Sequence, residues 1–211
     1  MNPLNPGREA ALIWYNKGKK VSAEIIIIKG GRIMDEIFRR GTCRYFKEKM
    51  PVPDDELLTL VKAGMQARAV GNQKSRDFII VTREDLVKAI SHNSIIAGPA
   101  RKASAAIVIV GKKEGISFPE EWTFDCAAAA QNILIEAEHL GLSTLWMQVY
   151  PYQDRKVHLC HILDIPDELD PFCIIAVGYA DKTPVRLNRY DENAVFLDLY
   201  GSHKKTVYTG K

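Results

Sequence analysis

Residues 125–142 read DCAAAAQNILIEAEHLGL, and residues 143–149 continue as STLWMQV. The alanine-rich stretch predicts a helix over residues 121–140 that ends at Gly141, because alanine favours helices and glycine favours their ends. The polar side chains of this helix follow one narrow stripe, formed by Asp125, Asn132, Glu136 and His139. A helix that is apolar over most of its circumference belongs at the centre of a fold or in a large subunit interface.

Strands and helices alternate around this central helix. Apolar residues at helical spacing predict helices over residues 34–39, 54–65, 84–91 and 152–164. Short apolar runs predict strands over residues 78–82, 105–111, 143–149 and 173–179. This alternation predicts an α/β or α+β fold in which helices sandwich a sheet.

The first 33 residues differ from the rest of the chain. They contain a basic stretch and an isoleucine run, Ile25 to Ile28, which favours a strand that the Gly30-Gly31 pair would end. We interpret residues 1–33 as an N-terminal extension outside the catalytic core, with Met34 as a second plausible start. An authentic extra strand is the alternative. Residues 34–211 then form one domain.

The composition is typical of a soluble globular protein. Of the 211 residues, 46% are hydrophobic and 26% are charged. The formal net charge of +3 is too small to predict a nucleic-acid partner. The longest apolar run is shorter than the roughly 18 residues of a membrane helix, and no secretory h-region is visible. We therefore expect a cytoplasmic protein that binds neither nucleic acid nor membrane.

The cysteines and histidines do not predict a metal site. The four cysteines form no CxxC pair, so we expect free, buried thiols at Cys43, Cys126, Cys160 and Cys173. Asp154, His158 and His161 are spaced so that a helix would place them on one face. A solvated stripe is much more common than a metal site at this spacing, and we predict no bound metal.

A cluster of arginines is the first candidate for chemistry. Residues 39–44 read RRGTCR, which places three guanidinium groups and a hydroxyl within six positions. Arginine keeps its charge at working pH, and its fork of donors matches phosphate oxygens. Gly41 would let the backbone approach an anion closely. A solvated basic turn is the alternative.

Two further segments carry polar or aromatic side chains beside predicted strands. Residues 69–78 read AVGNQKSRDF, in which Asn72 and Gln73 offer paired donors and acceptors and Lys74 offers a positive charge. Tyr150-Pro151-Tyr152 follows a strand that ends at Val149, where ligands of such sheets often bind. A polar loop and a packed turn are the structural alternatives.

Together these segments resemble the FMN-dependent nitroreductase family, from about Met34 to about Phe196. The opening pattern of that family, R-[RH]-[ST]-x-R followed by an aromatic residue, corresponds to residues 40–45. Its second pattern, A-P-S-A-x-N-x-Q-P-W-x-F, corresponds to residues 67–78. The central helix, the strand that follows it and the ending around residues 178–196 are also similar.

The resemblance implies an α+β fold with a mixed sheet sandwiched by helices. It further implies a homodimer in which a C-terminal arm packs on the partner and two FMN molecules lie in the interface. At the phosphate end, Arg40 and Arg189 would hold the FMN phosphate, with Gly41 and the Thr42 hydroxyl beside them. Lys182 and Arg186 are rival candidates for the C-terminal contact.

At the ring end, the resemblance implies five further contacts. Arg44 would lie near the N1–C2 carbonyl edge, where a fixed cation stabilises the reduced flavin. Asn72, together with Lys74, would come from the loop of the partner subunit. Val149 and Tyr150 would offer backbone groups to the ring.

The implied activity is that of an oxidoreductase. NADH or NADPH would reduce FMN and leave, and a small nitroaromatic or quinone-like acceptor would then take the electrons in a ping-pong cycle. The hydride chemistry belongs to the cofactor, so no catalytic side chain is predicted. One alternative is a different flavin reaction on the same fold, either reductive dehalogenation or a flavin-consuming oxidation. Another is a flavin-binding protein without reductase turnover.

The chain departs from the family pattern around the second segment. Arg68 and Ala69 stand where the family has proline and serine, and residues 74–76 read KSR in place of Gln-Pro-Trp. The second position of the arginine motif is Gly41. These changes make the expected pocket more basic and less aromatic. Our hypothesis is that the electron acceptor is anionic, or that substrate choice differs from that of the usual nitroaromatic reductases.

Overall fold

The computed structural model describes residues 13–16, 19–22, 35–93, 95–196 and 198–202. The chain divides into two compact units. One unit spans Lys29–Arg186 and contains the main sheet with its helices. The other combines Met1–Ile28 with Leu187–Lys211. The interpretation of residues 1–33 as an extension stays a prediction.

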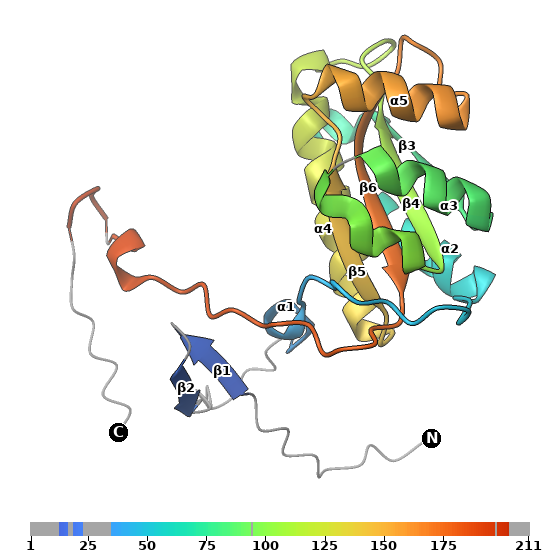
Figure 1. Cartoon of the computed structure of the whole chain (residues 1–211). Coiled ribbons are helices and arrows are strands. Elements are labelled where there is room, and N and C mark those ends of the chain that lie inside the picture. The colour runs from blue at the N-terminus through green and yellow to red at the C-terminus, as the bar shows by residue number, and fades with distance from the viewer. Residues whose placement is uncertain (1–12, 17–18, 23–34, 94, 197, 203–211) are drawn as a thin grey trace, which may run out of the picture. The chain divides into compact units, whose positions relative to one another are not determined.

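The larger unit is built on a four-stranded sheet in the order β3-β4-β6-β5 (Figure 1). Its strands are β3 (Arg76–Val81), β4 (Ala105–Gly111), β5 (Ser143–Gln148) and β6 (Asp170–Gly178). The two central strands, β4 and β6, are almost wholly buried. Their continuous apolar sequences follow from this, because both faces of a central strand are covered.

The three strand pairs are all antiparallel, which corrects the expectation of a mixed sheet. Strands β4 and β5 do run in the same direction, and α4 (Trp122–His139) connects them as a long crossover. The last strand, β6, enters between them and runs against both. Parallel pairing among the described residues is confined to the isolated bridge between Thr42 and Thr144.

Helices cover both faces of the sheet, as the alternating sequence predicts. One face packs against α3 (Glu84–Ile90) and α5 (Gln153–Leu163), and the other against α2 (Asp54–Met65) and α4 (Figure 1). Alternate residues of β6 divide between the two cores: Ile174 belongs to the first and Ile175 to the second. The α+β sandwich is therefore confirmed.

The central helix ends as its sequence indicates. Gly141 has a positive φ of 75°. The N–H of Leu142 donates to the Ala137 carbonyl (2.8 Å), and the N–H of Gly141 donates to the Glu138 carbonyl (3.2 Å). These two bonds form a Schellman motif, which satisfies carbonyls that the helix leaves free. The polar stripe of this helix is not solvent-exposed along its whole length: Asp125, at its N-terminal end, is 2% exposed and faces the protein interior.

The short elements were harder to predict. The smaller unit contains an antiparallel hairpin of β1 (Ile13–Asn16) and β2 (Lys19–Ser22). The predicted Ile25–Ile28 strand lies outside the described residues. Short 3₁₀ helices also occur at Val70–Asn72, Ser91–Asn93, Ile95–Lys102, Pro119–Glu121 and Glu192–Ala194.

The cysteines are free and buried, as predicted. Burial raises the pKa of the Cys126 thiol to about 12; the nearby Arg76 charge opposes this shift and the Asp125 charge adds to it. Among the described helices, none is both long and apolar enough to cross a bilayer.

Candidate functional site

The arginine segment crosses one end of the sheet. It follows α1 (Asp35–Arg39) directly. Thr42 pairs with Thr144 near the start of β5, and Phe46 pairs with Ala180 just beyond the end of β6. Residues 42–46 therefore lie along the edge at which β5 begins and β6 ends.

Side chains along this segment alternate between the buried side and the outer side, and only those on the outer side can contact a ligand. Cys43 is fully buried and its N–H donates to the Thr144 carbonyl (2.8 Å). Because successive side chains of an extended segment point to opposite sides, Thr42 and Arg44 share the outer side, and both are exposed.

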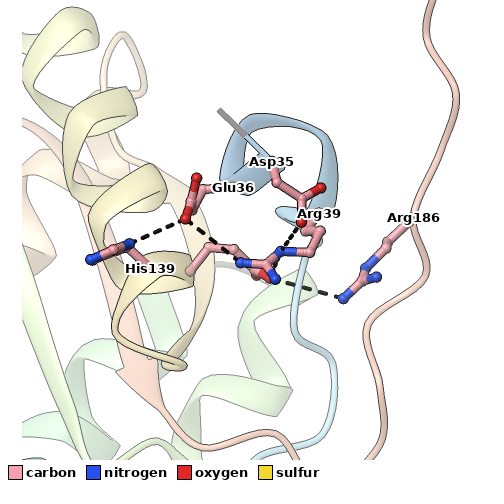
Figure 2. A network of polar contacts seen from close by, with 6 residues as sticks. Asp35, Glu36, Arg39, His139 and Arg186 are labelled. Carbon is pink, nitrogen blue, oxygen red and sulfur yellow. Dashed lines mark hydrogen bonds and ion pairs between the residues drawn. The ribbon is translucent and has the colours of Figure 1, made fainter. Parts of the chain in front are cut away.

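The two adjacent arginines have different environments. Arg39 forms ion pairs with Asp35 (3.3 Å), Glu36 (3.7 Å) and Glu138 (3.6 Å), as Figure 2 shows. Arg40 is half-buried, and its Nε is buried without a hydrogen-bond partner among the described residues. The sequence presents three similar guanidinium groups, whereas the structure neutralises Arg39 and leaves Arg40 available.

A second available guanidinium lies in the same network. Arg186 approaches the Glu138 carboxylate with Nη2 at 3.9 Å, and its Nε is buried with no hydrogen bond within the described part of the chain (Figure 2). Burial raises the pKa of Glu138, although Arg186 and Arg39 oppose the shift. Arg186 belongs to the same unit as Arg40, whereas Arg189 is exposed and belongs to the other.

Gly41 is required by the chain beside it. A Cβ at this position would lie 2.6 Å from Pro184 Cβ and 3.2 Å from the Val185 carbonyl oxygen. The sequence suggested that Gly41 lets the backbone approach an anion closely. In the structure, the chain that approaches Gly41 is instead the segment of Pro184 and Val185, which leads to Arg186.

The loop that contains Asn72 and Lys74 is anchored to α4 by Asp125. The Val70 N–H donates to Oδ1 (3.0 Å), and both Gln73 Nε2 (2.8 Å) and Ser75 Oγ (2.6 Å) donate to Oδ2. Burial acts to raise the pKa of Asp125, but these three hydrogen bonds and the Arg76 charge outweigh it and lower the pKa. Asp125 is thus an ionised, buried anchor.

The Gln73 amide forms hydrogen bonds within the protein and is not free to bind a ligand. Its amide oxygen accepts from the Phe118 N–H (3.0 Å) and its nitrogen donates to the Phe118 carbonyl (3.2 Å) as well as to Asp125. Gly71 and Asn72 adopt positive φ angles of 59° and 53°. The side chains of Asn72 and Lys74 are exposed.

Val149 and Tyr150 follow the far end of β5. Their N–H groups both donate to the Phe172 carbonyl, at 3.2 and 3.0 Å. The Val149 carbonyl accepts from the Tyr152 N–H (2.9 Å), and the Tyr150 carbonyl accepts from Gln148 Nε2 (3.0 Å). Their backbone groups therefore have partners within the chain, and a ligand there would use the second lone pair of a carbonyl.

The candidate residues form two groups at opposite ends of the sheet. Thr144, beside Thr42, and Val149 are separated by about 16 Å of strand. Arg76 at the start of β3 lies at the same end as Val149, because the register runs from Arg76 through Gly111 to Asp170. One chain thus brings Arg40, Arg44 and Arg186 to one end, and the loop of residues 72–74 to the other.

Residues weighed for a metal do not converge. His158 and His161 are exposed on α5. Among the residues that the structure describes, no three histidine, cysteine or acidic side chains form a metal-binding group.

Sequence reasoning missed the roles of Asp125 and Trp122. Asp125 stands out in hindsight as a carboxylate amid small apolar residues. The Trp122 ring packs edge-on against the Tyr150 ring, with centroids 4.9 Å apart, and lies directly on Gly111, where a Cβ would overlap it. The sequence signal for this contact is a glycine at the end of an otherwise apolar strand, AAIVIVG.

Known proteins share both sequence and fold with this chain. A model of the nitroreductase family matches residues 95–179. An Archaeoglobus fulgidus protein named NADH dehydrogenase/NAD(P)H nitroreductase is 31% identical over 144 residues, covering 68% of this chain and 82% of the relative. The structure of a Clostridium acetobutylicum protein described as an NADH oxidase aligns with a TM-score of 0.75 at 32% identity, over 79% of this chain and 100% of that one.

A second solved structure has the same arrangement. It is a Bacteroides thetaiotaomicron protein named NADH dehydrogenase/NAD(P)H nitroreductase, with a TM-score of 0.75 and 29% identity over 81% of this chain and 99% of that chain. The sheet, the covering helices and the sequence identity agree across these relatives, and the chain belongs to the nitroreductase family.

Proposed function

We propose that the protein is an FMN-dependent oxidoreductase that passes electrons from NADH or NADPH through bound FMN to a small nitroaromatic or quinone-like acceptor. At this end of the sheet the Nε atoms of Arg39, Arg40 and Arg186 are buried without hydrogen-bond partners in the described residues. Arg39 Nε lies within ion-pair distance of Asp35 and Glu138, so the observation that carries the proposal is the remaining two nitrogens, Arg40 Nε and Arg186 Nε. An unsatisfied buried donor is costly, and a phosphate oxygen would satisfy it with a charge-assisted bond. The donor set therefore fits a mononucleotide phosphate.

The chain's own residues bind and orient the cofactor. Arg40 and Arg186 hold the phosphate, and Thr42 adds a hydroxyl on the outer side of the same segment. Arg189 stays a candidate for the same contact. The Arg44 guanidinium provides a fixed positive charge for negative charge that develops on the ring. FMN, when bound, supplies the hydride and electron transfer.

A second copy of the chain completes the proposed site. Asn72 and Lys74 lie at the opposite end of the sheet from Arg40, so they would contact the FMN of a partner. The apolar side chains Leu58, Met65 and Phe124 on α2 and α4 are 50%, 60% and 66% exposed, which favours a subunit interface across these two helices. Sedimentation of the FMN-loaded protein tests this, and a monomer would contradict it.

The cofactor proposal is tested with Arg40→Gln and its matched neighbour Arg39→Gln. Apoprotein is titrated with FMN and followed by flavin fluorescence. Loss of one charge-assisted bond of roughly 1.5–3 kcal/mol should weaken FMN binding about 10- to 100-fold in Arg40→Gln. Arg39 is already paired with three carboxylates, so Arg39→Gln should change FMN binding less than about threefold. Equal affinities in the two variants would refute the phosphate assignment.

Turnover distinguishes an enzyme from a flavin carrier. The FMN-loaded protein should oxidise NADH or NADPH and then reduce an added acceptor, with the parallel double-reciprocal plots of a ping-pong cycle. FMN-loaded protein that reduces no acceptor would favour a binding role.

A further inference from the structure

A cavity of about 590 Å³ opens beside the loop that Asp125 anchors. It lies between the end of α2, the loop and the start of β3. Apolar and cationic side chains line it, among them Met65, Arg68, Lys74, Arg76, Phe78 and Lys112. This is the size of a small-molecule site.

The cavity is strongly positive. Four of its lining side chains are cationic, and one, Asp77, is anionic. Asp77 is already paired with Lys112 at 2.8 Å. Arg68 and Lys74 are exposed and stand at the cavity without an ion pair among the described residues. The local field therefore attracts an anion.

Arg76, which lines the same cavity, also contains a buried donor without a partner among the described residues. Its Nη2 donates to the Ala67 carbonyl (2.5 Å), which fixes the guanidinium in place. Its Nη1 is buried and has no hydrogen-bond partner in the part of the chain described. The carboxylate oxygens of the nearby Asp125 accept from Val70, Gln73 and Ser75. An oxygen of a bound anion would satisfy the free nitrogen.

We propose that this cavity binds an electron acceptor that carries a carboxylate or similar anionic group on an aromatic ring. The inference rests on the proposed flavin-dependent function and names its substrate class. Met65 and Phe78 supply apolar contact for the ring, and Arg68 with Arg76 selects the anion. The 2′-phosphate of NADPH has the same anionic chemistry, so the experiment separates the two half-reactions.

The test compares a nitrobenzoate with the neutral nitrobenzamide of similar size. Stopped-flow reoxidation of the reduced, FMN-loaded protein measures each acceptor, and reduction by NADH and by NADPH is measured separately. The charge-neutral variant is Arg68→Gln. Its matched control is Arg101→Gln, an exposed arginine that lines a different cavity.

The wild-type protein should prefer nitrobenzoate, and added salt should reduce that preference. Arg68→Gln should lower the second-order rate for nitrobenzoate about fivefold and leave nitrobenzamide unchanged within about twofold. Arg101→Gln should change neither acceptor. Calorimetric titration with benzoate and benzamide gives a readout without turnover, in which Arg68→Gln weakens benzoate binding alone.

Three results would overturn the inference. One is equal rates for the two acceptors in wild type at every salt concentration. Another is a defect of Arg68→Gln that is confined to reduction by NADPH, which would assign the cations to the electron donor. The third is a shift to monomer in Arg68→Gln with acceptor preference retained. Failure of the proposed function itself is distinguishable, because the protein would then bind no FMN or oxidise no NAD(P)H.

Discussion

The substitution Asp125→Asn removes the charge that anchors the loop of residues 70–75 and keeps the size and shape of the side chain. The asparagine oxygen still accepts from the Val70 N–H. The new amide NH₂ replaces Oδ2 and faces two donors, Gln73 Nε2 and Ser75 Oγ. Gln73 cannot reverse its amide without losing the bond from the Phe118 N–H. The Ser75 hydroxyl can rotate and accept, so one of the two lost bonds is replaced by a weaker one.

The expected cost follows from this count. Each hydrogen bond to a buried charged group contributes roughly 1.5–3 kcal/mol, and a neutral replacement returns about 1 kcal/mol. We expect Asp125→Asn to lower the free energy of unfolding by about 2–5 kcal/mol. With a urea dependence near 2 kcal/mol per M, the unfolding midpoint falls by about 1–2.5 M.

Urea unfolding followed by tryptophan fluorescence measures the effect. Gln131→Ala, an exposed change on the same helix, is the control and should stay within about 0.5 kcal/mol of wild type. Limited trypsin digestion reports the loop separately, because release of the anchor should expose the bond after Lys74. A midpoint for Asp125→Asn close to that of the control, with no faster cleavage, would refute the role of Asp125.

Three further predictions concern packing, backbone and pH. Gly111→Ala should lower the free energy of unfolding by about 3 kcal/mol or more, because the added Cβ would overlap the Trp122 ring. Thermal unfolding tests this prediction, and an unchanged melting temperature would contradict it. Gly141→Ala should lower the free energy of unfolding by only about 1 kcal/mol, because no atom lies within 4 Å of the added Cβ and the strain comes from φ of 75° alone. A destabilisation equal to that of Gly111→Ala would be inconsistent with this reason. The pKa of Asp125 is lower in the folded protein than its usual value of about 3.9, so its stabilisation is complete above that pH and is lost as pH falls through the folded-state pKa. Unfolding free energies of wild type and Asp125→Asn should therefore converge below about pH 4, and a constant difference down to pH 2 would argue against an ionised anchor.

Local sequence patterns predicted the main helices and strands of the larger unit with little error. The strand over residues 105–111 has the predicted bounds, and the central helix differs from its prediction by one residue at each end. These segments have apolar patterns long enough to identify their own structure. The hairpin of the smaller unit was missed, because its four-residue strands carry little pattern.

The sequence alone did not show which candidate side chains are already paired within the protein. The arginine segment predicts a phosphate-binding end, but only the structure distinguishes Arg39, which forms ion pairs with carboxylates, from Arg40, which forms none among the described residues. Gln73 was expected to offer its amide to a ligand, and the structure uses that amide to bind Phe118 and Asp125.

By itself, the sequence determined the longer helices and the strands of the larger unit, the buried character of the central helix and the family resemblance, because each depends on residues close together in the chain. The tertiary structure alone decided that β6 enters between β4 and β5, and that a carboxylate on the central helix anchors a distant loop. Ser75 and Asp125 are 50 positions apart, so no local pattern records their hydrogen bond. Partner choice for a buried polar group depends on which distant segments packing brings within about 3 Å.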